Sequence, residues 1–144
     1  MHDFSFCAKP NLLINLCELL QSHSQVLRKR AIDKVLELGF YGVSIDETTD
    51  VRVRSISSVI ARVCNQNGVA EECFLGIFQL HDGCADTIHA ALLTFIHEQG
   101  LPIEDLISLC TDGASSMAGV HAGVAARMRA INAGLMTFHC VNHR

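Results

Sequence analysis

In the segment LCTDGASSMAG, Leu109–Gly119, an apolar run ends abruptly in an aspartate. A glycine, an alanine and two serines follow Asp112. Taken alone, the segment has two interpretations. Asp112 either turns the chain or caps the next segment, as Asp often does beside glycine and serine, or it ends a strand and binds a ligand. The choice depends on whether Asp112 has partners elsewhere in the chain.

Residues 9–38 carry apolar side chains at three- and four-residue spacing, which predicts helix. The SHS triplet at Ser22–Ser24 predicts a break into two helices, with its last serine as the cap of the second. Gly39 is expected to end the helical segment. The basic RKR run of the second helix is interpreted as a solvated face rather than a DNA contact. We therefore assign residues 1–39 to an N-terminal helical segment.

After Gly39 the pattern changes to short apolar and β-branched runs. Three strands in an antiparallel meander are predicted at residues 40–46, 55–65 and 71–80, with the turn NQNG before the third. A helix, a buried strand, a second helix and a last strand are then predicted at residues 86–99, 105–112, 119–131 and 135–140. Residues 40–144 are thus expected to form one α/β domain with the order β-β-β-α-β-α-β.

This order places the two acidic strand ends together. A strand that returns through a helix to lie parallel to an earlier strand needs a right-handed crossover, with the helix on one face. If the strand ending in Asp112 lies beside the strand ending in Asp46, both carboxylates meet at the carboxyl ends of parallel strands, where open α/β sheets build sites. The expected architecture is the ribonuclease H-like arrangement, preceded by helices.

The stretch SIDETTD supplies the first acidic partner. It holds Asp46, Glu47 and Asp50 around two threonines. Because side chains alternate along a strand, Asp46 and Glu47 point to opposite faces, and only one can share a face with Asp112. We choose Asp46, which follows the apolar Ile45 at the end of the buried run. The alternative, that DETTD is a polar loop, stays open for the segment alone.

Two neighbouring carboxylates favour a metal site. Like charges in proximity repel, and one of the two pKa values would be raised. A divalent cation removes this conflict, and hard oxygen ligands suit Mg²⁺ or Mn²⁺. We therefore predict that Asp46 and Asp112 bind one of these ions, weakly.

The C-terminal HCVNHR holds His139, Cys140 and His143. Cys-x-x-His could form half of a zinc site, with Cys110 as one additional ligand, but no second half with paired spacing precedes it. We therefore do not expect zinc.

Composition sets the class of protein. At 144 residues, with about half of them hydrophobic, the chain fits one globular domain. Its apolar runs are too short to span a bilayer, and its first residues do not resemble a signal peptide. The seven cysteines, odd in number and without CxxC, are expected to be buried free thiols in a reducing compartment. We expect an intracellular protein without a membrane partner.

The charge distribution argues against direct DNA binding. No Lys or Arg occurs between Arg62 and Arg127, and residues 41–144 carry six arginines against eleven acids. Contacts to phosphates supply most non-specific affinity for nucleic acid. A DNA-associated role would therefore need metal ions or regions absent from this sequence.

Three segments together resemble the catalytic core of hAT-superfamily transposases. They are SIDETTDV, LCTDGASSMAGVHAGVAARMRA and TFHCVNHR, in this order, from about Phe40 to Arg144. They are especially similar to the domesticated relatives found beside BED-type and MYM-type zinc fingers. The resemblance implies a ribonuclease H-like fold, nuclear location and a metal-dependent acidic triad for DNA strand transfer. It also implies that Asp46 and Asp112 are the first two acids and that Cys140 and His143 form a motif near the DNA.

The sequence departs from that family in its acids. The third family acid is a glutamate beyond a large helical insertion, and no Asp or Glu follows Asp112 here. We therefore expect a catalytically incomplete domain that acts as an interaction module, associating with a protein partner or with itself. The alternative is a metal-dependent strand transferase or nuclease core within a longer chain. The last strand, 135–140, is expected to leave an apolar face uncovered.

Overall fold

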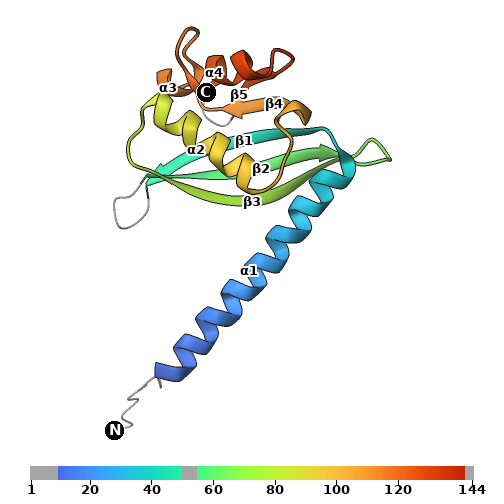
Figure 1. The fold of residues 1–144 in the computed structure, drawn as a ribbon, viewed down its shortest axis with the longest axis vertical. Coiled ribbons are helices and arrows are strands. Elements are labelled where there is room, and N and C mark those ends of the chain that lie inside the picture. The colour runs from blue at the N-terminus through green and yellow to red at the C-terminus, as the bar shows by residue number, and fades with distance from the viewer. Residues whose placement is uncertain (1–9, 50–54, 142–144) are drawn as a thin grey trace.

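The computed structural model describes residues 10–49 and 55–141, and within them a five-stranded sheet organises the chain (Figure 1). The strand order is β3-β2-β1-β4-β5. Their bounds are Tyr41–Thr49 for β1, Ser55–Cys64 for β2, Ala70–Leu80 for β3, Leu106–Thr111 for β4 and Met136–His139 for β5. The first three strands pair antiparallel, and β4 pairs parallel with both β1 and β5. The predicted α/β class and the predicted pairing of the first and fourth strands are confirmed.

Helices precede and connect the strands. They are α1 (Pro10–Leu38), α2 (Ala85–Glu98), the 3₁₀ turn η1 (Ile103–Asp105), α3 (Ser115–Ala118) and α4 (Val124–Ile131). One apolar core joins the sheet to α2 and α4. Val43, Ile45, Val59 and Leu109 supply its sheet side. Ile88, Leu92 and Met128 supply its helix side. Among the described residues, no helix is long and apolar enough to cross a membrane.

The predicted break in the N-terminal helix is wrong. The chain forms one helix from Pro10 to Leu38, with no interruption at Ser22–Ser24. The hydroxyl of Ser22 donates to the carbonyl of Glu18 at 2.9 Å, and that of Ser24 donates to the carbonyl of Gln21 at 2.9 Å. Serines in mid-helix can bond back to the preceding turn in this way instead of capping a new helix.

The helix predicted at residues 119–131 begins later in the structure, after two glycines. The helix α4 begins only at Val124, and the short α3 lies before the two glycines. Gly119 and Gly123 pack backbone against backbone, and the N–H of Gly123 donates to the carbonyl of Gly119 at 3.0 Å. A side chain at either position would meet backbone atoms, so this stretch forms a tight turn.

The predicted turns agree with the structure. Gly39 ends α1 with φ +81°, and its N–H donates to the carbonyl of Val35 at 3.0 Å. Gly68 closes the β2–β3 turn with φ +76°. Both conformations lie in the left-handed region, which glycine enters without steric cost.

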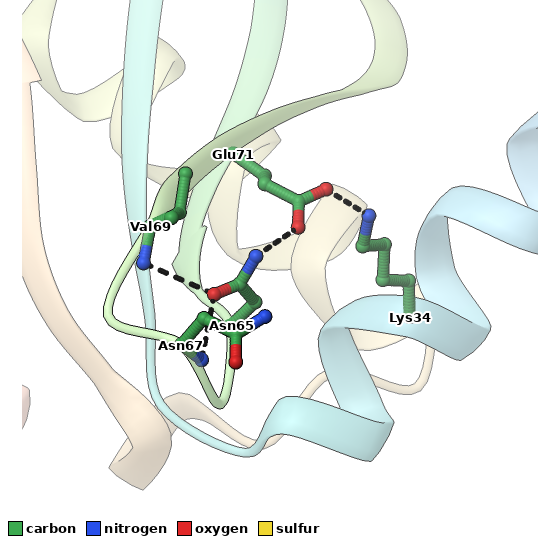
Figure 2. Close-up of polar contacts among 5 residues, drawn as sticks. All are labelled: Lys34, Asn65, Asn67, Val69 and Glu71. Carbon is green, nitrogen blue, oxygen red and sulfur yellow. Dashed lines mark hydrogen bonds and ion pairs between the residues drawn. The ribbon is translucent and has the colours of Figure 1, made fainter.

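A polar network fixes α1 to the sheet (Figure 2). Lys34 donates to a Glu71 carboxylate oxygen, and the side-chain amide of Asn65 donates to the other at 2.7 Å. The Asn65 oxygen accepts from the backbone N–H groups of Asn67 and Val69, at 2.9 and 3.0 Å. The β2–β3 turn is thereby linked to the end of α1, where Val35 is fully buried. The division predicted at residue 39 stays a prediction.

The cysteine prediction is only partly correct. The six described cysteines are free, and Cys7 lies outside the described residues. Only Cys73 among them is buried, while Cys17, Cys64 and Cys84 are exposed. An apolar neighbourhood in sequence did not imply burial, because Cys17 lies on the exposed part of α1, Cys64 at an exposed position of β2 and Cys84 directly before α2.

Candidate functional site

The candidate site lies at the carboxyl ends of β1 and β4. Val43 pairs with Leu109 and Ser44 pairs with Cys110 in the parallel register. Continued by two residues, this register puts Asp46 opposite Asp112. In parallel strands, paired residues point to the same face. Asp112 itself follows β4 as the first residue after Thr111, so the approach of the two acids named from the sequence stays a prediction.

The alternation of side chains along β1 places Asp46 and Glu47 on opposite faces of the sheet. Tyr41, Val43 and Ile45 are buried in the core below the helices, and Glu47 follows them on that face. Asp46 is exposed and shares the opposite face with Ser44. This face, which includes the Cys110 side of β4, is called the open face below. Asp46 is on the open face, and the same face is predicted for Asp112.

Asp112 also makes a turn. Its Oδ1 accepts the backbone N–H of Ala114 at 3.1 Å, which is an Asx turn. The buried Thr111 donates its hydroxyl to the carbonyl of Asp112 at 3.1 Å. The turn interpretation of this segment is thus correct. The Asx turn occupies one carboxylate oxygen of Asp112 with one hydrogen bond, which leaves capacity for a further ligand.

His139 is a neighbour that the site prediction did not include. It pairs with Thr111 across β4 and β5, and its imidazole lies so close to Gly113 that a Cβ there would clash with it. The HCVNHR segment contains His139, but spacing alone gave no reason to assign it to the acidic turn. Only the β4–β5 pairing brings it there.

Two thiols lie on the same side of the sheet as the acids. Burial raises the pKa of the Cys110 thiol, a hydrogen bond with Ser44 lowers it, and contact with Cys140 raises it. Cys110 and Cys140 are therefore close neighbours, and the backbone N–H of Cys140 donates to the carbonyl of Thr111 at 2.7 Å. The other predicted motif residue, His143, lies outside the described residues.

The donor chemistry of the acids fits a hard divalent ion. Two carboxylates with water would satisfy the oxygen preference of Mg²⁺, which usually keeps several waters. In residues 10–49 and 55–141, no group of three or more His, Cys, Asp or Glu side chains is arranged to bind a metal. A metal at Asp46 and Asp112 stays a prediction. When bound, such an ion would polarise a phosphoryl oxygen and activate a water.

An apolar surface borders this site. On β5, Met136 pairs with Ser108 and Phe138 pairs with Cys110, which puts both on the open face. Their exposed fractions are 53% and 54%. The strand leaves an apolar surface uncovered among the described residues, as the sequence predicted.

A comparison with known protein families identifies the family of this chain. A model of the family described as "ZMYM1/FAM200, RNase-like domain" matches residues 15–123. The match runs from α1 through the turn after Asp112, and so includes both candidate acids but not β5. It covers well over half of the sequence, and the chain belongs to this family. This membership agrees with the α/β sheet and fits a transposase-derived domain.

Proposed function

We propose that this chain, as a member of the RNase-like family, is a hAT-type transposase-derived domain that serves as a protein-interaction module in the nucleus. In this proposal, the domain has the RNase-like fold but does not catalyse DNA strand transfer. In this role, the open face beside Asp112 binds a protein segment.

The single observation that carries this proposal is the exposure of Met136 and Phe138. Large apolar side chains scattered singly on a surface are ordinary. These two lie on one strand at alternating positions, so they present a joint apolar strip. Contiguous apolar surface beside polar groups is typical of interaction sites. Covering one such side chain contributes about 1.5–3 kcal/mol.

The charges support a protein partner over naked DNA. Arg62, on the open face, forms an ion pair with Glu72. Arg127 lies 2.6 Å from a carboxylate oxygen of Asp86. These arginines are already compensated within the chain, which reduces the positive charge that phosphate binding requires. Association with DNA would then depend on other regions or on the partner.

A second function is supported by one observation. The parallel pairing of β1 with β4 supports the predicted approach of Asp46 and Asp112, which a two-carboxylate metal site needs. The second candidate is therefore a metal-dependent strand transferase or nuclease core, acting within a longer chain that supplies a further acid. Positioning and charge neutralisation by a full set of ligands accelerate phosphoryl transfer.

The test of the interaction role uses a matched pair of variants. Phe138→Asp places a charge on the apolar strip, whereas Val120→Asp changes an apolar residue in the turn between α3 and α4 that is more exposed, at 76% against 54%. Nuclear proximity labelling would identify neighbours, which are then purified and titrated with the chain. We expect a direct partner whose affinity falls at least about tenfold with Phe138→Asp and stays within twofold with Val120→Asp. Binding that is equally insensitive to both variants contradicts the role assigned to this face.

A further inference from the structure

The first two-thirds of α1 stand away from the rest of the domain. Every residue from 14 to 30 is exposed, while Val35 is fully buried and Ala31 and Leu38 pack against the core. Figure 1 shows this part of α1 projecting past β3 into solvent. Most of the stability of helices in proteins comes from tertiary packing of one face. The projecting segment therefore lacks the packing that usually stabilises a helix.

The projecting segment carries an apolar stripe. Leu16, Leu20 and Leu27 are 49%, 60% and 60% exposed, respectively. Their spacing of four and seven residues puts them on one face of the helix. A further step of four residues reaches Ala31, which packs on the core. The exposed stripe thus continues a face that is already used for packing within the domain.

A groove accompanies the stripe at its base. It has a volume of about 790 Å³ and lies between α1 and the edge strand β3. Leu27 and Ala31 line it from the helix, and Phe74 lines it from the strand. Arg28, also in its lining, lies against the backbone of Gly76, where any side chain would clash with it. The network of Lys34, Glu71 and Asn65 fixes the helix beside this groove (Figure 2).

The spacing of the stripe is symmetric. The intervals from Leu16 through Leu20 and Leu27 to Ala31 are four, seven and four residues, centred between His23 and Ser24. An antiparallel copy of the same helix would therefore place Leu20 against Leu27 and Leu16 against Ala31. Each contact would occur twice, as in an isologous two-fold interface.

The charges favour the antiparallel arrangement. In a parallel pair, the basic run at residues 28–30 would lie beside the same run of the second copy. In the antiparallel pair, the two runs are separated along the axis by about eleven residues, or about 16 Å at 1.5 Å per residue. This distance exceeds the Debye length of about 8 Å at physiological salt. Repulsion between the two runs is then largely screened.

We propose that α1 pairs antiparallel with α1 of a second copy of this chain, with the N-terminal part of each helix entering the groove beside Phe74 of the other. This surface is separate from the strip formed by Met136 and Phe138. The two proposals can therefore fail independently.

The first experiment is sedimentation velocity of the full chain over a concentration series. We expect a concentration-dependent dimer, and Leu20→Glu should weaken it at least about 100-fold because the substituted position occurs twice in the interface. The matched control is Ile14→Glu, since Ile14 is 55% exposed on another face of α1. Ile14→Glu and Phe138→Asp should both keep the dimer. A monomer at every concentration, or equal weakening by Leu20→Glu and Ile14→Glu, overturns the proposal.

The second experiment determines the orientation. A photo-crosslinking amino acid at the exposed position Cys17 should react with residues 28–31 of the second copy, because those residues lie opposite it in the antiparallel register. Mass spectrometry of the crosslinked dimer would locate the attachment. Crosslinks to residues 15–19 of the second copy would show parallel pairing and overturn the proposal.

Discussion

Ser44 on β1 pairs with Cys110 on the parallel β4, two residues before Asp46 and Asp112, respectively. The chain returns from β1 to β4 through two strands and a helix, so only the folded sheet brings the strand residues before these two acids together. Asp112 additionally shapes its own turn through Ala114. The same carboxylate therefore has a structural role and a predicted role as ligand, and these two roles can be separated experimentally.

The substitution Asp112→Asn separates the structural role of Asp112 from its predicted role as a metal ligand. The amide oxygen can still accept from the N–H of Ala114, but the negative charge is lost. We expect weak Mn²⁺ binding by the native chain, measured from the loss of the free-ion electron paramagnetic resonance signal. Asp112→Asn should weaken it by at least about tenfold, since hard cations need anionic oxygen ligands.

Asp82→Asn is the matched control for that titration. Asp82 also follows a strand, two residues after the end of β3, and accepts a backbone N–H, that of Cys84, at 3.0 Å. Its substitution should leave Mn²⁺ affinity unchanged. An equal loss of affinity in both variants would show that binding follows total charge rather than the predicted site.

The link between α1 and the β2–β3 turn should be measurable as stability. Asn65→Ala removes one donated and two accepted hydrogen bonds. We expect the free energy of unfolding to fall by about 1–3 kcal/mol, because three hydrogen bonds are lost, one of them part-buried. Chemical denaturation would measure this.

Asn67→Ala serves as the comparison for that measurement. Only the backbone N–H of Asn67 donates to Asn65, so the bond survives the substitution. A change below about 0.5 kcal/mol is expected for this exposed residue. Similar losses in both variants would mean that the turn, rather than the Asn65 side chain, determines the effect.

The sheet was predictable because its strands carry strong local signals. The β-branched runs and the NQNG turn indicated the antiparallel meander, and the order of elements then placed Asp112 beside Asp46. The neighbourhood of His139 and Gly113 was not predictable in this way, since it depends on the register of β4 with β5.

The errors arose where a local preference was satisfied in another way. Ser22 and Ser24 favour caps, yet their hydroxyls bond to carbonyls of the same helix. Gly119 and Gly123 lie within an apparently helical stretch, but their close backbone approach delays the helix to Val124. Both outcomes rest on contacts within three or four residues along the chain, and the spacing of residue types does not determine whether such contacts form in place of a cap or a continuous helix.

Stability should depend on pH through His89. Burial lowers the pKa of His89 below its usual 6.5, Arg127 lowers it further, and Asp86 raises it. Its Nε2 is buried and has no hydrogen-bond partner within the described residues. As the pH falls through 6.5, the unfolded chain takes up a proton at His89 before the folded chain does. Stability is therefore lost over the interval from 6.5 down to the lower pKa of the folded state.

Thermal unfolding between pH 7.5 and about 5 would test this dependence. We expect the slope to be reduced in His89→Gln. His97→Gln changes an exposed histidine of the same helix and should keep the native slope. A native slope in His89→Gln would assign the pH dependence to other groups.

Nicking of supercoiled DNA tests the central claim, interaction rather than catalysis, most directly. The purified chain would be incubated with plasmid in Mg²⁺ or Mn²⁺, beside its Asp112→Asn and Asp82→Asn variants. Because no Asp or Glu follows Asp112 in the sequence, two carboxylates alone are expected to position a metal too weakly for phosphoryl transfer. The account predicts no metal-dependent nicking by any of the three proteins. Nicking by the native chain that Asp112→Asn abolishes and Asp82→Asn retains would contradict it.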